Sequence, residues 1–127
     1  MAVFERVTRQ QLDVYVVLYC AFTQGEALHG YEISRKAHTT GPSTYRILDR
    51  LCEHHLVERW WEDLPPDQAR PRRRYYQLNP AGAATVRAII LERRPDALAE
   101  FGTPKGHTLP GFVTRLRRVL EAAGGAR

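Results

Sequence analysis

The chain has 127 residues, 43% of them hydrophobic, which is enough for the core of one domain whose stability self-association can complete. Its longest apolar run, Val14 to Phe22, is shorter than the roughly 18 residues that cross a bilayer, and Glu5, Arg6 and Arg9 interrupt the apolar segment that a signal peptide needs, so we expect a soluble, cytoplasmic protein without a membrane partner. The formal net charge of +5 favours an acidic partner, of which nucleic acid is the commonest.

Hydrophobic spacing predicts two helices in the first third of the chain. From Gln11 onward apolar side chains recur at three- and four-residue steps, which places them on one face of a helix that Gly25 ends. These side chains are Leu12, Tyr15, Val16, Tyr19 and Phe22. A second helix is predicted from Leu28 to Ala37, and turn-forming residues follow it at 38–41.

A third helix is predicted to begin at Pro42, because proline suits the first helical turn, with Gly41 or Thr40 as its cap. Its core face is expected to carry Tyr45, Leu48, Leu51 and Cys52. Its opposite face is expected to carry Ser43, Arg46, Ile47 and Arg50. A small polar and cationic stripe on a helix that follows another helix by a tight turn is typical of a recognition helix.

A β-hairpin with a long basic loop is predicted next. Aromatic and branched residues favour strands at Val57–Glu62 and Arg72–Leu78, and the breaker-rich stretch Asp63–Pro71 joins them. Strand alternation is expected to turn one of Trp60 and Trp61 toward the core and the other toward solvent. The hairpin carries four clustered arginines, Arg70, Arg72, Arg73 and Arg74.

The rest of the chain is predicted to form a helix, a connector and a last helix. An Asn-Pro pair at 79–80 caps and starts the first of these helices, which is expected to run to Arg94 before Pro95 stops it. Residues 102–107 are predicted to be a flexible connector, and the last helix spans 110–123. Its narrow apolar seam, which needs a partner to cover it, consists of Phe112, Val113, Leu116, Val119 and Leu120.

This order of elements predicts a mainly α fold with a small β-hairpin. We expect a winged helix-turn-helix in residues 1–94, then a linker and a C-terminal dimerisation helix in residues 95–127. Over roughly Leu12 to Arg94, several motifs in this order and spacing resemble the PadR family of bacterial transcriptional regulators. The motifs are Gly30-Tyr31-Glu32-Ile33, Tyr45-Arg46-Ile47-Leu48-Asp49-Arg50-Leu51, Trp61-Glu62, Arg70-Pro71-Arg72-Arg73-Arg74-Tyr75-Tyr76-Gln77-Leu78 and Gly82.

The resemblance implies a homodimer held by the first and last helices, which represses neighbouring genes until a small, often aromatic, ligand releases it. The residues then expected at the dimer contact are Leu12, Val16, Phe112, Leu116, Val119 and Leu120. The chain departs from the family pattern at Pro42, Ala69 and Asn79, where glycine, glycine and threonine are usual. Asparagine still caps a helix, whereas Pro42 changes the start of the third helix, so base contacts are not copied from relatives.

The residues also suggest how DNA would be held. A major groove about 12 Å wide admits one helix, and Arg46 and Arg50 lie one turn apart, where they can reach guanine edges or phosphates. The hairpin arginines would grip phosphate or enter the minor groove, which adds affinity more than sequence choice. In a dimer the two recognition helices would lie about 34 Å apart and read an inverted repeat in double-stranded DNA. The expected DNA-contacting residues are Tyr31, Ser43, Thr44, Arg46, Arg50, Arg70, Arg72, Arg73 and Arg74.

Several of these residues have a plainer alternative. Arg46 and Arg50 could instead form salt bridges with Asp49 or Glu53 on the same helix. Aromatic residues are candidates for a ligand site, although core or dimer packing is the favoured explanation for the tyrosines and one tryptophan could simply shield the hairpin. The candidate ligand-binding residues are Tyr15, Tyr19, Trp60, Trp61 and Phe112.

Two other functional classes remain open from the sequence. The protein could be an interaction module whose last helix binds a different protein, or a metal-sensing regulator that uses Cys52, His54 and His55. Adjacent histidines point about 100° apart on a helix and no CxxC or HxxxH pair is present, so no metal and no cofactor is expected. No catalytic motif is present either, so no enzyme is expected, and Cys20 and Cys52 are expected to be free thiols.

Overall fold

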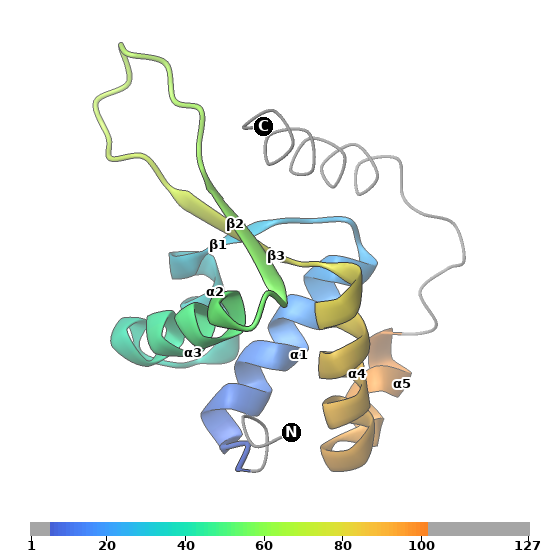
Figure 1. Ribbon diagram of the computed structural model, residues 1–127. Coiled ribbons are helices and arrows are strands. Elements are labelled where there is room, and N and C mark those ends of the chain that lie inside the picture. Colours follow the sequence, from blue (N-terminus) through green and yellow to red (C-terminus); the bar gives the residue numbers. More distant parts are fainter. Residues whose placement is uncertain (1–5, 102–127) are drawn as a thin grey trace.

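The computed structural model of the protein describes residues 6–101. This part of the chain forms five helices and three short strands (Figure 1). They are α1 (Arg9–Thr23), β1 (Leu28–His29), α2 (Gly30–Ala37), α3 (Gly41–Glu53), β2 (Val57–Trp61), β3 (Arg74–Leu78), α4 (Pro80–Arg93) and α5 (Pro95–Phe101). The mostly helical fold with a small antiparallel sheet confirms the predicted class. The helix predicted at 110–123 lies outside the described residues.

Helix α1 lies at the centre of the core, where it packs against α2, α3, α4 and β3. A capping box starts it two residues earlier than predicted. The Thr8 hydroxyl accepts from the Gln11 N–H at 3.1 Å, and the Gln11 side chain accepts from the Thr8 N–H at 2.7 Å. The helix ends as predicted, because Gly25 adopts a φ of 70°, which suits glycine. Its buried residues include Val14, Tyr15 and Leu18.

Helices α2 and α3 form a helix-turn-helix with a three-residue turn at 38–40. His38 adopts the left-handed conformation at the end of α2, and the Thr40 hydroxyl then caps α3 by accepting from the Ser43 N–H at 3.3 Å. Pro42 lies in the first turn of α3, as predicted. The turn is therefore held by local caps that the sequence encodes.

The prediction of which residues of α3 face the core is shifted by about one residue from the structure. The side chains that the helix buries are Thr44, Ile47, Leu48 and Leu51. Tyr45 is 46% exposed and Ile47 only 8%, the reverse of the expectation. The three- and four-residue steps from position 44 to positions 47, 48 and 51 make one continuous stripe, and this stripe is the face that packs inward.

The sheet has three antiparallel strands in the order β1-β3-β2. Leu28 of β1 pairs with Tyr76 of β3, and Val57 of β2 pairs with Leu78. Strand β1 was not predicted, because two residues are too few to show an alternating pattern and they were assigned to the next helix. Beyond the paired residues the β2–β3 hairpin projects away from the helical body as a wing (Figure 1).

Helices α4 and α5 close the described part of the chain. The Asn79 side chain caps α4 by accepting from the Gly82 N–H at 2.6 Å, as predicted. Helix α4 ends at Arg93, just before Pro95 and within one residue of the predicted end at Arg94. Pro95 then begins α5, which was not predicted, at a position where proline is tolerated. Across residues 6–101, none of the helices has the length and apolar content needed to span a membrane.

Candidate nucleic-acid interface

The exposed side of α3 carries two arginines that are free to bind an external partner. Arg46 and Arg50 are both exposed, one helical turn apart, and neither forms an ion pair within residues 6–101. The Arg46 guanidinium lies 3.4 Å from the Ser43 hydroxyl, its only polar contact in that part of the chain. The alternative in which these arginines bind acids of their own helix is therefore wrong.

The acid between them, Asp49, is paired with the wing instead. Arg59 on β2 donates to the Asp49 carboxylate at 3.0 Å. Both side chains are substantially exposed, so the pair adds little to stability. It does neutralise the negative charge that α3 would otherwise present beside Arg46, and it links α3 to the hairpin.

The four wing arginines are not equivalent. Both terminal nitrogens of Arg70 bind the Glu62 carboxylate, at 2.8 and 3.0 Å. Arg74 lies over the Trp61 ring at 5.1 Å from its centroid, with its Nε buried and without a hydrogen-bond partner in residues 6–101. Arg72 and Arg73 are exposed, and the Arg72 Nε donates to the Glu62 carbonyl at 3.1 Å. Two arginines therefore extend from the wing, and two are engaged within it.

A groove of about 660 Å³ lies between the start of α2, the exposed side of α3 and the base of the wing. It brings Tyr31 together with three wing arginines, whereas Ser43, Arg46 and Arg50 lie outside it. Tyr45, which was predicted to be buried, also lines this groove and packs directly on Gly30, where an added Cβ would come within 2.6 Å of the ring. The wing residues on its wall are Trp61, Arg72, Arg73 and Arg74.

Thr44 was predicted to contact DNA, but its side chain is fully buried. Its hydroxyl donates to the Thr40 carbonyl at 2.9 Å and lies 2.6 Å from the Thr39 hydroxyl. Thr44 therefore holds the turn before α3 and has no surface to offer a ligand. Tyr45, and not Thr44, is the exposed residue at this point of α3. A core stripe drawn through Thr44 and Ile47 would have predicted that Tyr45 is exposed.

The aromatic residues proposed for a ligand site do not converge on one cavity. Tyr15 and Tyr19 are buried in the core, where burial raises the pKa of Tyr15. Trp60 is partly buried and stacks on Tyr75 at a centroid distance of 6.2 Å, and Trp61 is 53% exposed. One tryptophan therefore faces solvent, as predicted, whereas the other is not among the buried residues of the core. Phe112 lies outside the described residues.

Most of the residues predicted for dimerisation lie outside the described residues. Leu12 is buried within its own chain, whereas Val16 is partly exposed on α1. Phe112, Leu116, Val119 and Leu120 lie outside residues 6–101.

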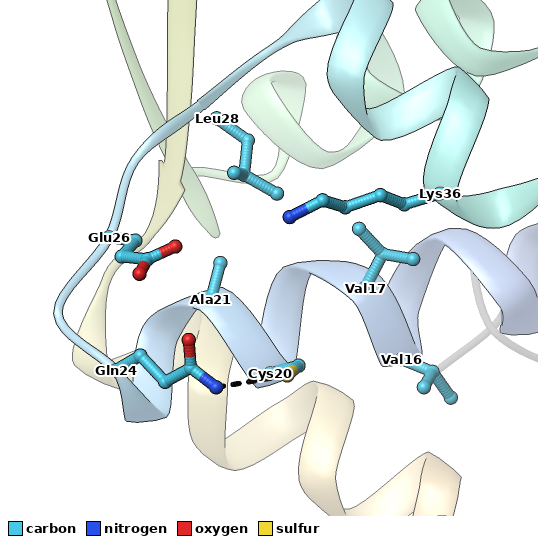
Figure 2. Close-up of a pocket in the computed structure, with 8 residues that line it drawn as sticks. All are labelled: Val16, Val17, Cys20, Ala21, Gln24, Glu26, Leu28 and Lys36. Carbon is cyan, nitrogen blue, oxygen red and sulfur yellow. Dashed lines mark hydrogen bonds between the residues drawn. The ribbon is translucent and has the colours of Figure 1, made fainter.

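A second, smaller hollow of about 230 Å³ lies between α1, β1 and α2 (Figure 2). Its apolar residues are Val16, Val17, Ala21 and Leu28, and its polar residues are Cys20, Gln24, Glu26 and Lys36. Figure 2 shows the Lys36 amine and the Glu26 carboxylate both pointing into it. Burial raises the pKa of the Cys20 thiol, so this group is neutral near pH 7.

The sulfur and imidazole groups at the end of α3 do not form a metal site. In the part of the chain that the structure describes, no three His, Cys, Asp or Glu side chains are grouped closely enough to hold a metal ion. Burial also raises the pKa of Cys52, which disfavours the thiolate that would bind zinc. The metal-sensing alternative therefore has no support among these residues.

A helix-turn-helix followed by a projecting β-hairpin, with cations on both, defines the winged-helix class of nucleic-acid-binding folds. A family model described as "Transcriptional regulator PadR-like family" matches residues 17–88, which is more than half of the chain. The protein belongs to this family of transcriptional regulators. No curated protein matches the chain.

Solved structures show the same fold at low sequence identity. A PadR family transcription regulator from hypervirulent Clostridium difficile R20291 is 18% identical, with a TM-score of 0.50 over 71% of this chain and 96% of that one. A MarR family regulator from Silicibacter pomeroyi is 21% identical, with a TM-score of 0.54 over 99% of this chain and 75% of that one. The MepR–DNA complex of S. aureus is 20% identical, with a TM-score of 0.50 over 92% of this chain and 81% of that one.

Proposed function

We propose that this regulator is a homodimer that binds an inverted repeat in double-stranded DNA through α3 and the wing of each subunit. The observation that carries the proposal is the set of exposed arginines without an acidic partner on these two elements. Arg46 and Arg50 lie on α3, and Arg72 and Arg73 lie on the wing. MepR, which has a similar fold, has been solved as a complex with DNA.

The two elements would do different work. Helix α3 enters the major groove, where Arg46 and Arg50 can donate to guanine edges and provide sequence choice. The wing lies along the flanking backbone, where Arg72 and Arg73 bind phosphate and provide affinity. The hydroxyls of Tyr31 and Tyr45, in the groove between the two elements, can donate to phosphate as well.

The salt dependence of binding tests the role of the wing. In the double variant Arg72→Ala/Arg73→Ala, the slope of log K against log salt should become shallower by up to about 1.8 per protomer, or about 3.6 for the dimer, because each phosphate contact contributes about 0.9. Arg87→Ala is the control, since Arg87 is an exposed arginine on α4, away from the wing. DNA affinity that is the same in the double variant and the wild type would contradict the proposal.

Recovery of genomic DNA fragments with the purified protein tests the symmetry of the site. We expect the bound fragments to share an inverted repeat whose half-sites are one helical turn apart, because a twofold dimer presents two α3 helices about 34 Å apart. Fragments that share only a single half-site, or a chain that sedimentation shows to be monomeric at micromolar concentration, would contradict the dimer.

We also propose that the regulator is a repressor and that a small aromatic ligand releases it. The hollow in Figure 2 supports this proposal, because an occupant would touch α1 and α2 together and so bear on the helix-turn-helix. Its volume of about 230 Å³ is below the roughly 300–1,000 Å³ of pockets for drug-sized molecules, so only a small ligand fits. Lys36 and Glu26 offer one charge of each sign to its polar group.

A transcription assay on a promoter that carries the recovered site tests the repressor, and a panel of aromatic compounds tests release. Lys36→Gln should lose the response to the active compound and keep DNA binding, whereas Arg35→Gln, the adjacent exposed cation on α2, should keep the response. Transcription that rises when the protein is added, or equal responses in both variants, would contradict this part of the proposal.

A further inference from the structure

Glu62, the residue that follows β2, is the centre of the polar contacts at the base of the wing. Its carboxylate binds the two terminal nitrogens of Arg70 at 2.8 and 3.0 Å. The same carboxylate accepts from the Tyr75 hydroxyl at 3.4 Å and from the Arg73 N–H at 3.5 Å. Its side chain is only 16% exposed, so these donors surround it.

The backbone of Glu62 is tied to the same arginine strand. Its N–H donates to the Arg73 carbonyl at 2.7 Å, and its carbonyl accepts from the Arg72 Nε at 3.1 Å. Glu62 thus contacts three of the four clustered arginines, Arg70, Arg72 and Arg73, and it does so where the paired strands give way to the long loop. Without these contacts the arginine side chains of the loop would be mobile in the free protein, and DNA binding would have to order them.

An acid in this position is unexpected on electrostatic grounds, because a negative charge among DNA-facing arginines repels phosphate. Arg70 binds the carboxylate in the bidentate geometry that favours its charged form, and it lowers the pKa of Glu62. The acid therefore stays ionised, and Arg70 is occupied with it. A structural gain has to offset the repulsion if Glu62 is to help binding.

We propose that Glu62 is a positioning residue that braces the wing for DNA, and that Arg70 is its partner within the wing and not a phosphate contact. The inference rests on the proposed DNA binding by the wing. Holding Arg72 and Arg73 in place before DNA arrives removes part of the ordering cost that a mobile, rotamer-rich side chain imposes on association. The brace thus raises affinity although its own charge opposes binding.

Two adjacent acids allow a matched test of this brace. Asp63 is the next residue, is exposed, and makes no hydrogen bond or ion pair within residues 6–101. Glu62→Gln and Asp63→Asn each remove one negative charge from the wing and barely change side-chain size. Simple Coulomb repulsion predicts that both variants bind DNA more tightly, whereas the brace predicts opposite effects.

DNA affinity is measured on a mixed-sequence duplex long enough to span two half-sites. We expect Glu62→Gln to weaken binding about three- to tenfold, as the loss of order at one or two arginines implies, with the salt slope unchanged because the phosphate contacts still form in the complex. Asp63→Asn should bind as tightly as the wild type or tighter. Tighter binding by Glu62→Gln as well would overturn the brace.

The same salt slope tests whether Arg70 contacts Glu62, as proposed, or a DNA phosphate. Arg70→Gln should weaken binding with its slope unchanged, and the double variant with Glu62→Gln should bind no worse than the weaker single variant, because both changes break one interaction. A slope that falls by about 0.9 per protomer, or about 1.8 for the dimer, in Arg70→Gln would assign Arg70 to phosphate and overturn the proposal. Far-UV circular dichroism and thermal unfolding show that each variant is folded.

Limited trypsin digestion tests the brace without DNA. Cleavage after Arg72 and Arg73 should be faster in Glu62→Gln than in Asp63→Asn or the wild type, since the wing opens more often once the carboxylate contacts are lost. Equal cleavage rates in all three proteins would overturn the brace even if DNA binds. A wild-type protein that binds no duplex would instead refute the proposed function, and faster cleavage would still support the brace.

Discussion

Gly82 and Gly41 provide a pair of identical substitutions for which the structure predicts opposite signs. Both residues lie in the first turn of a helix, and neither has a positive φ. From sequence alone, glycine to alanine within a helix is expected to stabilise by up to about 1 kcal/mol. The surroundings of the two glycines differ, and they should decide the result.

A methyl group at Gly82 has no room. Its carbon would lie 1.9 Å from the carbonyl oxygen of Leu56, where ordinary van der Waals contact starts at 3.4 Å, so α4 and the Leu56 backbone must separate by about 1.5 Å. That shift stretches the hydrogen bond from the Asn79 N–H to the same carbonyl, now 3.1 Å. We assign about 1–3 kcal/mol to the overpacking and about 1 kcal/mol to the hydrogen bond. After the helical gain, Gly82→Ala should destabilise by about 1–3 kcal/mol.

Gly41→Ala is the control, because nothing lies within 4 Å of its added Cβ. It should stabilise by about 0.4–1 kcal/mol through the lower entropy of the unfolded chain. Urea unfolding at one fixed protein concentration measures both, since self-association makes apparent stability depend on concentration. In thermal unfolding, 1 kcal/mol corresponds to about 4–8 °C for a domain of this size. A Gly82→Ala protein as stable as the wild type would refute the close contact between α4 and Leu56.

Three smaller perturbations test other parts of the fold. Thr44→Val removes buried hydrogen bonds and should lower the unfolding free energy by about 1–2 kcal/mol in urea, without changing the salt slope of DNA binding. Burial raises the pKa of Cys20 and Cys52 above 9.0, so the stability linked to these thiols is complete below about pH 9. This stability is lost as pH rises through the pKa values of the thiols in the folded protein. A double Cys→Ala variant should not show this loss when unfolding is measured as a function of pH. Asp13→Asn breaks the 2.7 Å bridge to Arg94 and should cost about 0.2–1 kcal/mol, less at high salt, in paired urea titrations.

The helices with strong caps or long apolar stripes were predictable from the sequence. Thr40, Pro42 and Asn79 mark helix starts because their side chains or rings satisfy the first turn locally, and no tertiary information is needed to see this. The face of α3 was not predictable from hydrophobicity alone. Thr44 is polar but buried, because its hydroxyl donates a hydrogen bond to the Thr40 carbonyl in the preceding turn. With Thr44 on the buried face of the helix, Tyr45 faces solvent.

Strand β1 and helix α5 were missed for a different reason. Leu28 and His29 form a strand only because β3 lies beside them, and a two-residue strand carries no period of its own. Pro95 ends one helix and begins another, so the same residue served as a stop signal in the sequence and as a start in the structure. Both features depend on what the segment packs against, which composition does not reveal.

The arginine-rich motif also overstated the number of charges available to DNA. Within the motif, Arg70 is paired with Glu62. Arg74 is held over Trp61. The exposed arginines on the two elements that have no acidic partner within residues 6–101 are Arg46, Arg50, Arg72 and Arg73.

The salt dependence of DNA binding measures how many arginines contact phosphate, and this number can be compared with the number that have no acidic partner in the structure. With about 0.9 per phosphate contact, four free arginines set an upper slope of about 3.6 per protomer, and about 7.2 for a dimer with both wings engaged. Binding of the wild-type protein to its recovered site, titrated with potassium chloride, measures this slope directly. A slope well above that limit would mean that further cations reach phosphate when DNA binds, such as Arg59, Arg70 or Arg74 after leaving its partner. If Arg70 is one of these cations, its pair with Glu62 is a resting arrangement that DNA replaces, and the braced wing inferred for Glu62 is excluded.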